Sequence, residues 1–207
     1  MKINLSGVEN ILFDLGRVLL NLDFEASANA FEELNLSADA LNIGMVFSDP
    51  VFLNFEVGET TPAEFRNRVR QILCNPHATD RQIDNAWYAM VLDIPEKRVH
   101  MLKNLAKTRK LYLFSNTNVI HTYRFKRDFR EKYGFEFSSL FIKDFYSHDI
   151  QQRKPDLSAF QKVIQLAGIK PEKSLFIDDL KENVEGAQKA GMRAFLLESG
   201  MEISDML

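Results

Sequence analysis

Six polar residues in this sequence stand where apolar segments end, and their side chains suit chemistry on a phosphate group. They are Asp14, Ser115, Asn116, Lys154, Asp178 and Asp179. The set offers a carboxylate nucleophile, hydroxyl and amide donors, a fixed cation and a second acidic pair. A phosphate binds donors and positive charge, whereas Mg²⁺ binds carboxylate oxygens, so one site built from these residues could hold both.

Asp14 has two interpretations. It follows Ile11-Leu-Phe13, which has the pattern of a buried strand, and it precedes a turn at Gly16. At the carboxyl end of a strand in an open α/β sheet, an acidic side chain lies where ligands bind. Asp is also a common cap of turns and helices. On this stretch alone both interpretations stay open. The presence of similar residues after several other strands favours the chemical one.

The elements that would position these residues alternate along the second half of the chain. Expected strands occupy residues 111–114, 145–147, 174–177 and 193–197, and helical patterns separate them. Strands that alternate with helices form parallel sheets, whose carboxyl ends share one edge. Together with the first strand at residues 11–13, the pattern predicts an α/β fold with a Rossmann-like parallel sheet.

The segment between Leu20 and Lys107 has a helical pattern throughout. Two capping-box signatures, Thr61-Pro-Ala-Glu64 and Thr79-Asp-Arg-Gln82, predict helix starts, and further helices are expected at Ala40–Phe47 and after Pro95. Because this block separates the first strand from the others, we expect an all-helical cap at residues 21–107. The cap would be inserted into a core made of residues 1–20 and 108–207.

Composition narrows the function classes. A net charge of −3 over 207 residues argues against nucleic acid or an acidic membrane as a partner. The basic residues between Arg124 and Arg130 fit the solvated face of a helix, and the four histidines lack metal-ligand spacing. A single cysteine, and the absence of a signal-peptide pattern or a membrane-spanning segment, predict a cytoplasmic protein.

In four motifs the sequence resembles the haloacid dehalogenase superfamily, and its phosphatase branch in particular. The motifs are Phe13-Asp-Leu-Gly-Arg-Val18, Leu113-Phe-Ser-Asn-Thr117, Arg153-Lys-Pro-Asp156 and Ile177-Asp-Asp-Leu-Lys-Glu-Asn183. The helical block corresponds to the family's inserted cap. Its segment Glu56–Phe65 is similar to that of a subgroup that includes bacterial glucose-1-phosphate phosphatases.

The resemblance implies a role for each site residue. Asp14 would be the nucleophile and form an aspartyl-phosphate, and Lys154 would neutralise charge on Asp14 and on the phosphate. Ser115 and the Asn116 backbone amide would bind phosphate oxygens. Mg²⁺ would be held by Asp14, the Gly16 carbonyl oxygen and Asp178, with Asp179 as a further ligand or as a residue that orients the ligands.

One position departs from the family pattern. Family phosphatases usually carry a second Asp two residues after the nucleophile, as the acid and base for the leaving group, and here that position is Gly16. Loss of such a group typically lowers the rate by about 10²–10⁴. Asp23 could replace it or contact the substrate, although its place before a helix favours an N-cap.

The sequence therefore predicts a Mg²⁺-dependent hydrolase of a small phosphomonoester, with a sugar phosphate suggested by the subgroup resemblance. The expected partner is that small molecule, and the protein is expected to be a monomer or a homodimer. Two alternatives remain open. One is a hydrolytic 2-haloacid dehalogenase, and the other is a catalytically impaired module that binds phosphorylated ligands because Gly16 replaces the usual acid.

Overall fold

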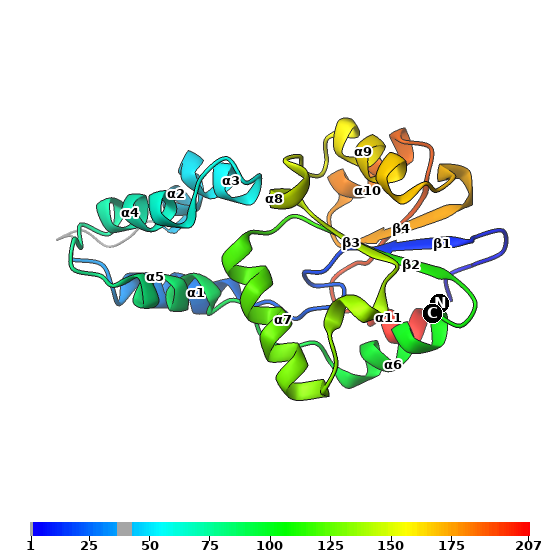
Figure 1. Cartoon of the computed structure of the whole chain (residues 1–207), viewed down its shortest axis with the longest axis horizontal. Helices are drawn as coiled ribbons and strands as arrows, with labels where there is room; N and C mark the ends of the chain where they lie inside the picture. Colours follow the sequence, from blue (N-terminus) through cyan, green and yellow to red (C-terminus); the bar gives the residue numbers. More distant parts are fainter. Residues whose placement is uncertain (1, 37–42) are drawn as a thin grey trace.

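The computed structural model describes residues 2–36 and 43–207 and contains one five-stranded parallel sheet (Figure 1). Its strands are β1 (Asn10–Phe13), β2 (Lys110–Ser115), β3 (Lys143–Tyr146), β4 (Ser174–Asp178) and β5 (Arg193–Leu196). Their order across the sheet is β3-β2-β1-β4-β5, with β1 paired in parallel to both β2 and β4. The predicted α/β, Rossmann-like sheet is therefore confirmed, with the strand that precedes Asp14 at its centre.

Side chains alternate between the two faces of the sheet, as the period of a strand requires. Ile11 and Phe13 pack in one hydrophobic cluster, whereas Leu12 packs in a second cluster on the opposite face. Both clusters are covered by helices, which is why the inner positions of the central strands are apolar on both faces.

Helices cover both faces of the sheet (Figure 1). They are α6 (Glu96–Leu105), α7 (Val119–Tyr133), α8 (Ser147–Ile150), α9 (Leu157–Ala167), α10 (Lys181–Lys189) and α11 (Ile203–Met206), with 3-10 turns at Phe137–Leu140 and Pro171–Lys173. Residues of α6, α7 and α11 complete the cluster of Phe13, and residues of α9 and α10 complete that of Leu12.

The remaining helices form a separate lobe to the left of the sheet in Figure 1. They are α1 (Phe24–Glu32), α2 (Ile43–Phe47), α3 (Pro50–Glu56), α4 (Pro62–Ile72) and α5 (Asp80–Tyr88). Aromatic residues fill this lobe, including Phe55 and Phe65, whose stacked rings lie 4.4 Å apart. The predicted helix at Ala40–Phe47 is described from Ile43 onward, and its earlier residues lie outside the described part of the chain.

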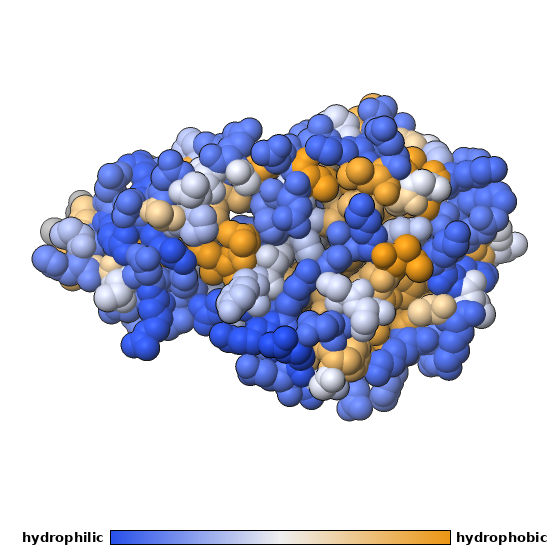
Figure 2. Space-filling view, in the orientation of Figure 1, coloured by the Kyte–Doolittle hydropathy of each residue, from blue (hydrophilic) through white to orange (hydrophobic). Residues whose placement is uncertain are grey.

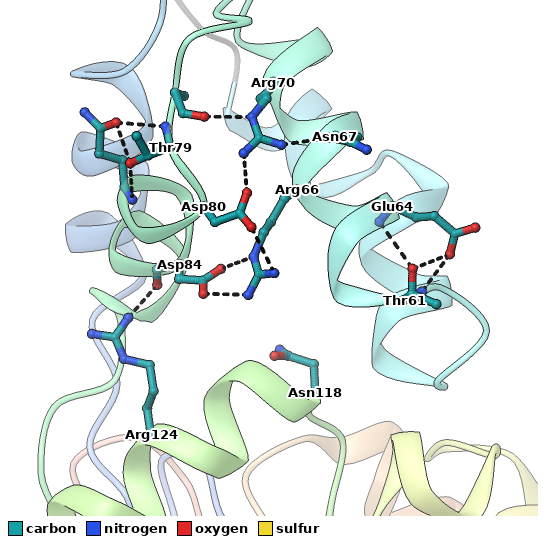
Figure 3. A network of polar contacts seen from close by, with 12 residues as sticks. Thr61, Glu64, Arg66, Asn67, Arg70, Thr79, Asp80, Asp84, Asn118 and Arg124 are labelled. Atoms are coloured by element: carbon teal, nitrogen blue, oxygen red, sulfur yellow. Dashed lines mark hydrogen bonds and ion pairs between the residues drawn. The ribbon is translucent and has the colours of Figure 1, made fainter.

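Both capping boxes are present. The Thr61 and Thr79 side chains accept from the backbone amides of Glu64 and Gln82, whose side chains accept in return from the threonine backbone amides. Ion pairs of Arg66 with Asp84 and of Arg70 with Asp80 then join α4 to α5 (Figure 3). The backbone amides at the start of α4 and α5 thus find hydrogen-bond partners within the lobe.

The lobe contacts the core through α7, through α8 and the loop that follows it, and through its two chain connections. Arg124 of α7 donates to the Asp84 backbone carbonyl at 2.9 Å (Figure 3). Leu22 and Val91 form an antiparallel bridge, so the outgoing and returning connections run side by side. This pairing holds the lobe over the edge of the sheet where Asp14 lies.

The helix α6 lies with the core in space, although the predicted cap boundary at residue 107 includes it. Its buried residues Val99, Leu102 and Leu105 belong to the cluster of Phe13 on the sheet. We therefore propose that the inserted cap ends before α6.

An ion pair between the buried Arg98 and the partly exposed Glu202 fixes α6 to α11. The Arg98 guanidinium donates twice to the Glu202 carboxylate, both at 3.0 Å. Partial burial acts to raise the pKa of Glu202, but this pair and two bonds from Ser204 outweigh it and lower the pKa to about 2.

Hydrophilic residues cover most of the cap in the space-filling view, and apolar atoms gather in small patches (Figure 2). Within the described residues, no helix has the length and apolar character needed to cross a membrane.

Candidate active site

The polar strand ends converge on one buried lysine. Lys154, in the loop after α8, has a side chain that is 1% exposed. Its Nζ lies 2.6 Å from Asp14 Oδ1 and 2.7 Å from Asp178 Oδ2. A buried lysine with two carboxylate partners is not an ordinary surface lysine, so Lys154 belongs to the candidate site. The fold brings Lys154, Asp14 and Asp178 together.

Three carboxylates make a suitable site for a hard cation. Ligand oxygens of Asp14, Asp178 and Asp179 all lie within 4.8 Å of one another. Mg²⁺ prefers a few carboxylate oxygens together with water or phosphate oxygens. This donor set fits Mg²⁺, and Asp14, Asp178 and Asp179 are the residues that would hold it. The predicted contribution of the Gly16 carbonyl stays a prediction.

The carboxylates influence one another because they are buried together. Burial raises the pKa of Asp14 to about 7, with the Asp178 charge adding to the rise and Lys154 opposing it. Burial also raises the pKa of Asp179, again with a contribution from Asp178. Burial alone would lower the pKa of Lys154, but the Asp14 and Asp178 carboxylates outweigh it and raise that pKa.

Asp178 is held in place by Asn183 of α10. The Asn183 side-chain amide donates to both Asp178 oxygens, at 3.0 and 3.1 Å, and the Leu180 backbone amide donates to Oδ1 at 2.9 Å. This buried asparagine ends the fourth motif, but it was not among the predicted site residues. Its position five residues after Asp178 was the available signal.

The segment after β2 supports the site from the other side. Ser115 is buried and lines the same cavity as Asp14. The Asn116 side chain donates to the Lys154 carbonyl at 2.9 Å and accepts from the Lys154 backbone amide at 3.0 Å. Asn116 therefore fixes the loop that carries Lys154. Phosphate binding by Ser115 and by the Asn116 backbone amide stays a prediction.

Gly16 is explained by packing. Its φ does not lie in the left-handed region, but a Cβ there would come within 2.9 Å of Leu22 Cδ1 and 4.0 Å of Asp14 Oδ2. A side chain at residue 16 would therefore start near Asp14 and displace the end of Leu22.

Asp23 caps helix α1. Its Oδ1 accepts from the backbone amides of Glu25 and Ala26 at 3.0 and 3.3 Å. It is absent from the residues that line the cavity described next. The structure favours the capping role over the alternatives of a substitute acid or a substrate contact.

Cap and core line an open cavity of about 450 Å³ above these strand ends. The cap contributes an apolar wall that includes Phe24, Phe47, Phe52 and Trp87. Polar lining residues beyond the predicted set are Arg17, Glu56, Thr117, Asn118, His121, Arg153 and Asn183. Glu56 and Arg153 stand in segments that carry the family resemblance, but the sequence predicted a role for neither of them, because their meeting depends on how the cap docks on the core.

His121 is neutral at physiological pH. Burial lowers its pKa to about 4, and its ring stacks on Trp87 with the centroids 4.8 Å apart. Its Nε2 donates to the Trp87 carbonyl at 3.0 Å. The histidine thus joins α7 to the cap wall.

Comparison with known proteins identifies relatives of this arrangement. A family model described as haloacid dehalogenase-like hydrolase matches residues 100–197. A solved haloacid dehalogenase family enzyme from Bacteroides thetaiotaomicron, in its magnesium complex, is 35% identical with a TM-score of 0.89. That match covers 96% of this chain and 98% of that one. A structure of this enzyme with magnesium and inorganic phosphate has a TM-score of 0.85 and 34% identity over the same shares.

Two further relatives extend over nearly the whole chain. D-ribitol-5-phosphate phosphatase from Bacteroides thetaiotaomicron is 24% identical over 94% of each chain. A HAD-like family hydrolase from Porphyromonas gingivalis is 28% identical with a TM-score of 0.84, over 94% of this chain and 93% of that one. With the site geometry and a relative above 30% identity over almost its full length, this chain belongs to the haloacid dehalogenase-like hydrolase family.

Proposed function

We propose that this protein is a phosphatase that hydrolyses a small phosphomonoester with Mg²⁺, through an aspartyl-phosphate on Asp14. The observation that carries the proposal is the placement of Lys154 between Asp14 and Asp178, with Asp179 close to both carboxylates, beside a cavity that the cap covers in part. Relatives named as phosphatases, and a relative crystallised with magnesium and phosphate, support it.

The first step needs an anion to approach an anion. An Asp14 carboxylate oxygen attacks phosphorus, and the bond from phosphorus to the leaving oxygen breaks. Lys154 supplies a fixed positive charge at 2.6 Å from the nucleophile, which reduces the repulsion between carboxylate and phosphate. Bound Mg²⁺ would add positive charge and orient a phosphate oxygen. Ser115 and the Asn116 backbone amide donate to the remaining phosphate oxygens.

The second step returns Asp14 to its starting form. Water attacks phosphorus of the aspartyl-phosphate, the bond to the Asp14 oxygen breaks, and inorganic phosphate leaves. Asn183 and Asn116 take no part in bond changes, and they hold Asp178 and the Lys154 loop in position. With Gly16 in place of an acid, the leaving oxygen receives no proton from that position and takes up its proton from solvent water.

The size of the site favours a small substrate. A cavity of about 450 Å³ is in the usual range for small-molecule sites, and the cap over it limits access by large partners. We propose a sugar or sugar-alcohol phosphate, supported by the relative named D-ribitol-5-phosphate phosphatase.

The test is release of inorganic phosphate from a panel of phosphate esters, with Mg²⁺ and with excess chelator. We expect release that depends on Mg²⁺. Halide release from 2-haloacids in chelator, without phosphate release from any ester, would instead support a dehalogenase. The paired Asp178 and Asp179 carboxylates disfavour that alternative, because attack on carbon needs no metal site.

A further inference from the structure

We infer that Glu56, oriented by Arg153, recognises a neutral leaving group that carries hydroxyl groups. The inference rests on the proposed function, since it concerns the part of the ester that the phosphate site does not bind. Glu56 would be the residue that selects this group.

Glu56 and Arg153 meet across the cavity from opposite lobes. Glu56 ends helix α3 of the cap, and Arg153 directly precedes Lys154 in the core. Arg153 Nε donates to Glu56 Oε2 at 3.0 Å, and both residues line the cavity. The side chain of Glu56 is 24% exposed and that of Arg153 is 35% exposed, so both remain accessible to a bound molecule. The proposed chemistry at phosphorus uses neither of them.

The position of Glu56 is fixed by the core. Its backbone carbonyl accepts from Ser147 Oγ at 2.6 Å, and the same Oγ accepts from the Thr117 amide at 2.9 Å. Gly58, with φ +75°, packs so closely on the core that a Cβ would lie 2.4 Å from the His148 carbonyl oxygen. Glu56 is therefore held beside the segment that follows Ser115 and Asn116.

The charges of the cavity indicate what kind of leaving group fits. Each cation that lines it lies against a carboxylate: Lys154 against Asp14 and Asp178, Arg17 against Asp179 at 3.8 Å, and Arg153 against Glu56. A leaving group with its own carboxylate would compete with the carboxylate that already lies against each cation. A neutral group with hydroxyls can instead donate to the Glu56 carboxylate, whose two oxygens accept several hydrogen bonds.

The test compares substrates that differ in hydroxyl groups. We would measure kcat/KM with Mg²⁺ on ribitol 5-phosphate, on pentyl phosphate, which has the same carbon chain without hydroxyls, on phosphoglycolate and on p-nitrophenyl phosphate. We expect ribitol 5-phosphate to exceed pentyl phosphate and phosphoglycolate. Glu56→Gln should lower the ratio of ribitol 5-phosphate to pentyl phosphate by about 10- to 100-fold, the usual effect of a hydrogen bond to a charged group.

Two more variants separate recognition from cap stability. Arg68→Gln breaks an ion pair with Asp49 that lies in the cap away from the cavity, and it should leave the ratio as in wild type. Glu56→Asp keeps the charge but has a shorter side chain that withdraws it from the cavity, so it should also lower the ratio. This variant replaces Glu56→Gln in the test if the Gln variant folds poorly. A KM that rises more than kcat falls would support recognition.

Three results would overturn the inference. An unchanged ratio in folded Glu56 variants that still hydrolyse p-nitrophenyl phosphate would reduce the pair to a latch between cap and core, with the proposed function intact. Phosphoglycolate as the best substrate would also overturn it and leave that function intact. Wild-type protein that hydrolyses none of the four esters would overturn the proposed function and this inference with it.

Discussion

Placing an acid at residue 16 should restore catalysis selectively for poor leaving groups. A Cβ at this residue would lie 4.0 Å from Asp14 Oδ2, so the carboxyl group of Gly16→Asp starts close to the reacting atoms. A positioned acid typically contributes about 10²–10⁴ in rate when the leaving oxygen needs a proton. An alkyl oxygen needs that proton, whereas nitrophenolate leaves readily without it.

The cost of the substitution comes from packing. The new Cβ would meet Leu22 Cδ1 at 2.9 Å, which forces the end of that flexible side chain to move. Overpacking of this kind usually costs about 1–3 kcal/mol of stability. We therefore expect a lower melting temperature for Gly16→Asp, with folding retained. The double variant Gly16→Asp/Leu22→Val should recover part of the loss.

The assay is kcat/KM on a primary alkyl phosphate and on p-nitrophenyl phosphate. Gly16→Asp should raise the alkyl-to-aryl ratio by at least about tenfold, the lower part of the effect of a general acid. Gly16→Asn is the matched control, because it has nearly the same shape and cannot donate a carboxyl proton. Asp23→Asn should leave the ratio unchanged, since Asp23 caps α1. Equal ratios for the Asp and Asn variants at residue 16 would refute the missing-acid reasoning.

Three other variants test how the site and the fold are held. Asn183→Ala should weaken Mg²⁺ binding by about 10- to 100-fold in calorimetry, because Asp178 loses the amide that orients it; equal affinity would count against this role. Gly58→Ala should lower the melting temperature more than Gly134→Ala does. Both glycines have positive φ, but only at Gly58 would a Cβ meet backbone, and equal losses would contradict the packing argument. Glu202→Gln should lower the free energy of unfolding by about 1–2 kcal/mol at pH 7. This is less than the free energy equivalent to the whole pKa shift of Glu202, because the carboxylate is partly solvated. Since the folded pKa of Glu202 is lowered from 4.5 to about 2, this difference should shrink as the pH falls between those values in urea titrations, and a constant difference would contradict it.

Much of the core could be predicted because its signals are local. Buried strands are recognisable as short apolar runs. Each capping box depends on a threonine and on the residue three positions later, as at Thr61 and Thr79. Parallel strands end at a common edge, so Asp14, Ser115 and Asp178 could be brought together without knowledge of any side-chain contact.

What could not be predicted depends on contacts between distant segments. Glu56 and Arg153 are separated by 97 positions and meet because the cap docks on the core, which no periodicity encodes. In sequence, α6 is amphipathic like the helices of the cap before it. Its apolar face packs on the sheet and not in the cap, and no local pattern distinguishes the two partners. The reason for Gly16 also emerged from its neighbour Leu22 and not from its own backbone angle.

The central claim, that Asp14 is the nucleophile, is tested most directly by Asp14→Asn with p-nitrophenyl phosphate as substrate. The amide has nearly the same shape but is a far weaker nucleophile, and this substrate needs no leaving-group acid. At saturating Mg²⁺, and with a near-UV circular dichroism spectrum that matches wild type, kcat should fall by at least about 10³-fold. Turnover within about tenfold of wild type in the purified variant would contradict the account.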